Sequence, residues 1–283
     1  MSSNVLRWPG AAQALARVVE VPAVVRIIRE LKMKKVGIGV LIVLGVSLLI
    51  WLNYALFAGK ILGLTPEVRA ALRSDGEVTV TLLEGDSWLV MIPGQATPAT
   101  GLILYPEGHM DVRSYALVGR EIARRGFQVV FLSRRLETEY SEAEEQQRIE
   151  AVMSAYPQIE RWVVGGHTWG GQVGVDYAAN HPDRVAGVVL WAGRMGGTTT
   201  LSNSNLPVLM VYGTLDDENV DLVASTRPFL PEHTVWVTIE GGNRAQFANF
   251  GPMPADAAAT ISSESQQAQA VAATVEFLSG LSE

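Results

Sequence analysis

The sequence contains no cysteine. This absence excludes disulfide frameworks, thiolate nucleophiles and metal sites built from cysteine. Histidine is also scarce, and the pattern of its four copies supports no metal site: His109, His167, His181 and His233. We therefore predict neither a metal nor a cofactor.

The charge is unevenly distributed along the chain. Residues 1–35 carry seven Lys/Arg and two Glu, a net charge of +5, whereas the remainder carries 15 basic and 27 acidic residues, a net charge of −12. An acidic main domain argues against nucleic acid as its partner. The simplest interpretation of the acidic excess is a solvated surface.

A long apolar run, Val36–Phe57, contains no charged residue, and the mean hydropathy of the whole chain is +0.19. At ~1.5 Å per residue in a helix, the run spans the ~30 Å hydrocarbon core of a bilayer. Trp51 and Tyr54 suit one interface, and the lysines at 32, 34 and 35 precede the other end. We predict an uncleaved transmembrane anchor over 36–58, because the run is too long for a signal peptide and no small-x-small cleavage site follows. The positive-inside rule then leaves the N-terminus cytoplasmic and exports the main domain to the periplasmic or extracellular side.

The basic arm, residues 1–35, has apolar residues at helical spacing with arginines between them, interrupted near Pro22. This pattern is typical of an interfacial helix on the inner leaflet, and a helix docked on another membrane subunit has the same pattern. Both alternatives make the membrane, or a membrane protein, the expected partner of this end.

From residue 61 to residue 283, short apolar runs alternate with amphipathic helical patterns. Two alternating runs, Val78–Leu83 and Trp88–Ile92, predict an antiparallel hairpin at a sheet edge. Further strands are expected over 102–105, 127–132, 162–165, 185–191, 208–212 and 234–239, and helices over 65–72, 115–125, 142–155, 171–180, 220–229 and 263–278. Strands buried on both faces and separated by helices indicate an α/β, doubly wound, mostly parallel sheet.

Four motifs follow the predicted strands in order. Gly166-His167-Thr168-Trp169-Gly170 lies between a strand and a helix, which is the setting of a G-x-S-x-G nucleophile elbow, with Thr168 at the serine position. Tyr105-Pro106-Glu107-Gly108 stands where the oxyanion loop belongs. Tyr212 to Asp216 ends the next-to-last strand, where the acid belongs, and Glu240 to Phe247 follows the last strand, with Arg244 at the histidine position.

Taken together, residues 101–278 resemble the bacterial α/β-hydrolase family whose members look like YPGG…GGHSLGG…YGTLD…EGGNHAQF. The resemblance implies the α/β-hydrolase fold and, for the family, a Ser–Asp–His acyl hydrolase. It also implies oxyanion donors from a loop that here contains Glu107 and Gly108, and from Trp169 after the nucleophile position. Of the catalytic triad, only Asp216 is unchanged in this sequence.

The departures bear on chemistry. Arg244 cannot act as the base, because a guanidinium keeps its proton and has no acceptor lone pair. Thr168 is β-branched at a position that usually takes a strained conformation. Glu107 brings negative charge to a place where negative charge would develop during acyl transfer. We predict that Arg244 pairs directly with Asp216 and that Glu107 completes the pair.

The remaining expectations concern access to the pocket and a histidine that could replace the missing base. His109, in the oxyanion loop, is the one histidine placed to substitute as a base near Thr168, although a histidine on the loop surface explains it better. His167 should point away from the pocket. The segment 191–205, where this fold inserts lids, is short, so no large lid is expected and the pocket mouth should be uncovered. The segments 193–205 and 249–260 look flexible.

Three functions remain open. The first is a pseudoenzyme that is an accessory or scaffold subunit of a membrane complex. The second is an exported ester or amide hydrolase with Thr168 as an atypical nucleophile. The third is a module that binds a small ligand or an anion in the remaining pocket.

Overall fold

The computed structural model describes residues 44–49, 64–83, 87–95, 97–108, 110–133, 141–197, 199–216, 221–252 and 256–281. The chain divides into two units, Met1–Ala58 and Gly59–Glu283. In the first unit, residues 44–49 are helical. The other residues of the predicted anchor Val36–Phe57, and the whole predicted arm 1–35, lie outside the described residues. Within the described ranges, no helix combines the length and the apolar character needed to cross a membrane.

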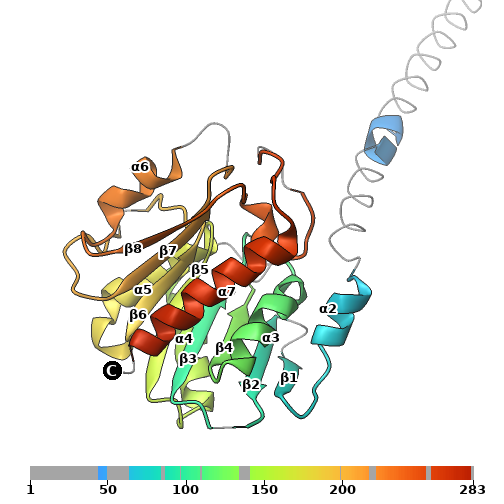
Figure 1. Cartoon of the computed structure of the whole chain (residues 1–283). Coiled ribbons are helices and arrows are strands. Elements are labelled where there is room, and N and C mark those ends of the chain that lie inside the picture. The colour runs from blue at the N-terminus through green and yellow to red at the C-terminus, as the bar shows by residue number, and fades with distance from the viewer. Residues whose placement is uncertain are drawn as a thin grey trace, which may run out of the picture. The chain divides into compact units, whose positions relative to one another are not determined.

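The second unit is built on an eight-stranded sheet with the order β1-β2-β4-β3-β5-β6-β7-β8 (Figure 1). The strands are β1 Val78–Leu83, β2 Trp88–Pro93, β3 Thr100–Tyr105, β4 Gln128–Leu132, β5 Arg161–His167, β6 Gly187–Trp191, β7 Val208–Gly213 and β8 Val235–Ile239. β1 pairs with β2, and β2 with β4, in the antiparallel sense, whereas all pairs from β4 to β8 are parallel. The carboxyl ends of the parallel strands therefore meet at one edge of the sheet.

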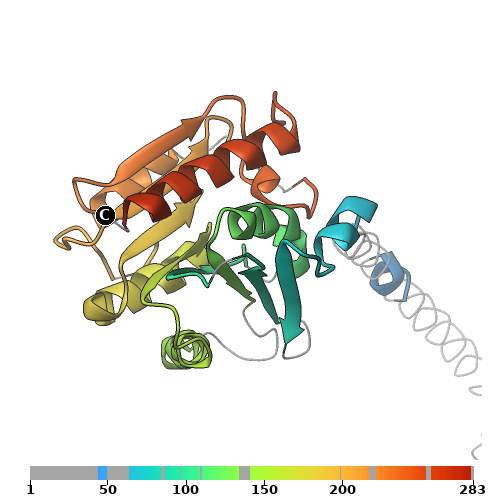
Figure 2. The same ribbon diagram turned by 60° about the horizontal axis from the view of Figure 1, so that its bottom comes forward.

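Helices cover both faces of the sheet (Figures 1 and 2). They are α2 Pro66–Ala71, α3 Ala116–Arg124, α4 Glu142–Ala155, α5 Gly170–Asn180, α6 Leu222–Thr226 and α7 Ser263–Gly280. One core contains buried residues of α2, α3 and α7, and the other contains buried residues of α4 and α5. Within β3, Leu102 and Leu104 belong to the first core, and Ile103 and Tyr105 to the second. This alternation explains why the strands read as continuous apolar runs, since both faces are buried.

The predicted α/β architecture with a mostly parallel sheet is confirmed, and so is the hairpin at its edge. The strand bounds agree with the predictions at half of the ends and differ by one or two residues at the others. The predicted helix 115–125 corresponds to α3, which the 3₁₀ turn Val112–Tyr115 precedes. The predicted helix 220–229 is divided into α6 and the 3₁₀ turn Arg227–Phe229. Between β6 and β7, the described residues form no helix or strand, in agreement with the expected lack of a large lid.

Close approach of backbones fixes α5 against β5 and β5 against β6. A Cβ added to Gly174 in α5 would lie 2.4 Å from Cα of Gly165 in β5, and one added to Gly165 would lie 1.7 Å from the carbonyl oxygen of Val189 in β6. Both distances are far below van der Waals contact, so only glycine fits at these two positions. This packing sets the depth at which α5, and the turn before it, sits over the sheet edge.

Gly174→Ala should therefore lower the free energy of unfolding by about 3 kcal/mol, because backbone cannot move aside as a side chain can. Urea-induced unfolding followed by circular dichroism measures the loss. Gly280→Ala is the matched control, since a Cβ there meets nothing within 4 Å. Equal stabilities for the two variants would contradict this packing.

Candidate active site

The turn between β5 and α5 has the backbone of a nucleophile elbow. Thr168 has φ 49°, a left-handed conformation that is costly for a β-branched residue. Its N–H donates to the carbonyl of Trp191 at 2.9 Å, and its carbonyl accepts from the N–H groups of Gly171 at 3.0 Å and Arg194 at 3.1 Å. These bonds hold the strained residue in place between strand and helix.

The Thr168 side chain is closed off from solvent. The residue has no exposed surface, and its Oγ1 makes no hydrogen bond within the described part of the chain. The neighbouring Trp169 is 51% exposed. The expectation of an uncovered mouth is therefore wrong at Thr168 itself. Although residues 193–197 form no lid, they run beside the elbow, and the bond between Arg194 and Thr168 fastens them there.

His167 lies in the core behind the elbow and joins the oxyanion loop to it. The N–H of Glu107 donates to the Tyr115 hydroxyl at 2.9 Å, and that hydroxyl lies 2.8 Å from Nδ1 of His167. Burial lowers the pKa of His167 to about 3, against an opposing contact with the backbone of Arg244. The ring is therefore neutral, and Tyr115 donates to Nδ1. Because Nδ1 is occupied in this way, His167 is unsuited to be a base for Thr168.

Two backbone donors remain available beside the elbow. The N–H groups of Gly108, which has φ 47°, and of Trp169 make no hydrogen bond to any described residue. Trp169 follows the nucleophile position and Gly108 belongs to the oxyanion loop, which are the sources of oxyanion donors in such elbows. Of the residues expected to supply oxyanion donors, Gly108 and Trp169 thus have unoccupied N–H groups, whereas the N–H of Glu107 donates to Tyr115.

Asp216, in the turn that follows β7, pairs with an arginine that the sequence analysis did not identify. Arg194 Nη2 donates to Asp216 Oδ1 at 3.1 Å, and the two side chains are 11% and 1% exposed. Arg194 follows β6, the strand next to β7, so both residues stand at the same edge of the sheet. The sequence did contain a signal for Arg194. It is an arginine just after a buried parallel strand, and the motif residues lie at the same edge of the sheet.

The predicted pair between Arg244 and Asp216 is wrong in its partners. Arg244 Nε lies 3.7 Å from Oδ1 of Asp256, and Asp256 Oδ2 accepts from the N–H of Ala245 at 2.7 Å. Asp256 can reach Arg244 because the chain before α7 folds back along the loop after β8. Thr260 N–H donates to the Gly241 carbonyl at 2.8 Å, and Asn243 Nδ2 donates to the Ala257 carbonyl at 2.8 Å. The described part of the segment 249–260 is thus hydrogen-bonded rather than loose.

Glu107 stands near both pairs without joining either. Its side chain is buried and makes no ion pair with a described residue, so it does not complete the pair as expected. Burial raises the pKa of Glu107 to about 7, against the opposing pull of Arg244 and Arg194, and with further upward contributions from Asp216 and Asp256. Burial likewise raises the pKa of Asp216 to about 6, although Arg194 opposes the shift. We call Glu107, Arg194, Asp216, Arg244 and Asp256 the charged cluster.

Comparisons with known proteins agree with this geometry. Residues 101–268, more than half of the chain, match the model of the alpha/beta hydrolase family. The chain belongs to the alpha/beta hydrolase family. No match is found among curated proteins.

Solved structures with the same fold are distant in sequence. A predicted CIB-like hydrolase from Thermoplasma acidophilum is 14% identical, with a TM-score of 0.51 over 72% of this chain and 98% of that chain. Two structures of an esterase from Pyrobaculum calidifontis are 17% identical, with TM-scores of 0.57 over 80% of this chain and 91% and 89% of those chains. At these identities, the similarity is evidence for the fold alone.

The remaining histidines offer this hydrolase-family domain no base within the described residues. His181 Nε2 lies 3.3 Å from Gln146 Oε1, and His233 Nε2 lies 3.1 Å from the Leu206 carbonyl, both away from the elbow. His109, the suggested substitute, lies outside the described residues. No group of three His, Asp or Glu side chains in the described ranges is arranged to hold a metal ion.

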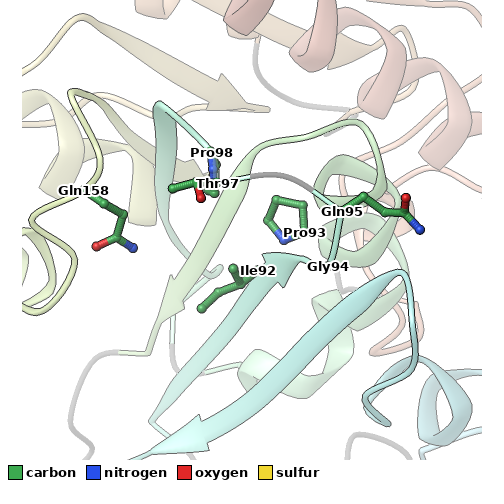
Figure 3. Close-up of a pocket in the computed structure, with 7 residues that line it drawn as sticks. All are labelled: Ile92, Pro93, Gly94, Gln95, Thr97, Pro98 and Gln158. Carbon is green, nitrogen blue, oxygen red and sulfur yellow. The ribbon is translucent and has the colours of Figure 1, made fainter.

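A separate cavity of about 560 Å³ lies at the opposite edge of the sheet (Figure 3). Its lining comes from the end of β2 and the segments before β3 and β5, and includes Pro93, Gln95, Pro98 and Gln158. These segments precede the amino ends of β3 and β5, whereas the elbow follows the carboxyl end of β5. The cavity is therefore separate from the site formed by the triad positions.

The raised pKa of Glu107 makes stability depend on pH. A folded-state pKa of about 7, above the ordinary 4.5, means that the folded protein holds this proton more tightly than the unfolded chain. The contribution is fully present below pH 4.5 and is lost as pH rises through 7. Glu107→Gln, which imitates the protonated side chain, should equal the parent protein at pH 4.5 and exceed its unfolding free energy at pH 8 by about 1–3 kcal/mol.

Urea unfolding at the two pH values measures this difference. Glu160→Gln is the control, because the Glu160 side chain is 71% exposed. A Glu107→Gln variant that is no more stable than the parent at pH 8 would contradict the burial of a titrating carboxyl at this position.

Proposed function

We propose that this protein is a catalytically inactive member of the alpha/beta hydrolase family, anchored in a membrane as an accessory or scaffold subunit of a protein complex. The observation that carries the proposal is the pairing of the acid position, Asp216, with the guanidinium of Arg194. In an active triad this carboxylate orients a histidine, which takes the proton of the nucleophile. Here it is bound to a group that cannot take that proton.

The proton of Thr168 has no acceptor among the described residues. Arg244 occupies the histidine position and pairs with Asp256. His167 is neutral and receives the hydrogen of the Tyr115 hydroxyl. Without a base, attack by the hydroxyl should be slower by about 10⁴–10⁶, which is the loss of rate seen when a triad residue is removed. The buried charged cluster is then a structural replacement for the triad.

The anchoring half of the proposal rests on the chain before the domain. Val36–Phe57 is uncharged and long enough for a bilayer, and the arm before it is basic. This arrangement favours a cytoplasmic N-terminus and an exported domain. Gentle solubilisation should copurify other membrane proteins in stoichiometric amounts, and a clean monomer would count against the subunit role.

A second candidate is an ester hydrolase that uses Thr168. The observation in its favour is the pair of unoccupied donors, Gly108 N–H and Trp169 N–H, beside an elbow with the usual left-handed backbone. The likeness of fold to two esterase structures is compatible with it. This candidate needs a base, and His109 is the histidine left to provide one.

Hydrolysis of p-nitrophenyl acetate by the full chain in detergent separates the two candidates. We expect no turnover above the Thr168→Ala variant. We also expect Thr168→Ser/Arg244→His to remain near background, because Arg194 still holds Asp216, and Arg194→Ala added to that pair to raise the rate above it. Circular dichroism checks the folding of each variant. Turnover by the parent that vanishes in Thr168→Ala would establish the esterase candidate instead.

A further inference from the structure

Five segments that are distant in the sequence each supply one member of the charged cluster. Glu107 follows β3, Arg194 follows β6, Asp216 follows β7, Arg244 follows β8, and Asp256 precedes α7. All five lie at one edge of the sheet over the elbow. Fully ionised, the cluster has three carboxylates and two guanidiniums, and so one uncompensated negative charge. Protonation of one carboxyl balances it.

We propose that the charged cluster is a pH-sensitive clasp, which keeps these loops closed over Thr168 while Glu107 is protonated and loosens them when Glu107 ionises. The inference goes beyond the proposed function, since it concerns the conformation of the loops and holds whether or not the domain turns over a substrate.

Glu107 is the source of the uncompensated negative charge in the cluster. Asp216 and Asp256 each have an arginine within ion-pair distance, whereas Glu107 has none among the described residues. Its Oε2 is buried without a hydrogen bond there, as are Oδ2 of Asp216 and Oγ1 of Thr168. An ionised carboxylate in this place would be desolvated and unpaired, which is costly unless the loops part and admit water.

The groups facing Glu107 set the pH at which this occurs. Its electrostatic neighbours are Arg244, Arg194, Asp216 and Asp256, together with Tyr115, whose pKa burial raises well above its usual range. The pKa of Glu107, about 7, is the higher of the two raised carboxyl values in the cluster. Asp216, with a pKa of about 6, ionises first and is stabilised by Arg194. His167, with a pKa of about 3, stays neutral over the whole range. Glu107 therefore loses its proton after Asp216, and its ionisation unbalances the cluster.

Two hydrogen bonds donated by backbone N–H groups report on the clasp. Arg194 N–H donates to the Thr168 carbonyl, and Ala245 N–H donates to the Asp256 carboxylate. Both should break when the loops part, whereas the amides of the central strand β5 should not. Loss of protection at these two sites, with β5 unchanged, distinguishes opening of the clasp from global unfolding.

The test is amide hydrogen exchange of the full chain in detergent between pH 5.5 and 8.5, corrected for the intrinsic exchange rate. If opening restores an ordinary pKa to Glu107, the fraction open at Arg194 and Ala245 should rise about tenfold or more, with a midpoint near pH 7. Glu107→Gln should remove the rise, and the exposed control Glu160→Gln should keep it.

Two results would overturn the proposal. One is the same rise in Glu107→Gln, and the other is a parent protein with no titration near pH 7 at these amides. The second result needs no variant, so it stands even if Glu107→Gln folds poorly. The exchange experiment does not depend on whether Thr168 hydrolyses an ester, and the ester assay does not depend on whether the clasp opens. The inference and the proposed function are therefore tested separately.

Discussion

The ion pair between Arg194 and Asp216 is the interaction on which the character of this site depends. A carboxylate that ends β7 in this family can orient a catalytic imidazole only if nothing stronger occupies it. The guanidinium of Arg194 lies 3.1 Å away, and both side chains are nearly buried. Because breaking a buried pair leaves an uncompensated charge, the pair is hard to open once formed. The acid is retained, and its partner in this structure is an arginine.

The other arginine at this edge of the sheet is also paired. Arg244 has a carboxylate of its own in Asp256, so neither arginine is an unbalanced charge. Tyr115 connects Glu107 to His167 and thereby ties the oxyanion loop to the elbow. The strained backbone of Thr168 persists because three backbone hydrogen bonds and the contact of α5 with β5 hold it. The same sheet edge and elbow that can hold a nucleophile in position for catalysis can also hold a closed, charged cluster.

Local patterns in the sequence were sufficient for the architecture. Continuous apolar runs predicted the buried parallel strands, and the motif order predicted that Thr168, Asp216 and Arg244 follow β5, β7 and β8. The pairing within the site was not predictable in the same way. Asp216 had two arginines within reach of the same edge, and the choice of Arg194 depends on the path of the loop after β6. Asp256 became a partner only because the chain before α7 turns back along the loop after β8. Such choices are set by tertiary packing, which no motif records.

We have proposed that Thr168, which is closed off from solvent and has no base among the described residues, is not a nucleophile. Mass spectrometry of the full chain after treatment with a fluorophosphonate probe, which labels activated hydroxyl nucleophiles, tests this most directly. We expect no adduct on Thr168 in the parent protein. An adduct on Thr168 that forms with the folded protein and is absent after denaturation would contradict it.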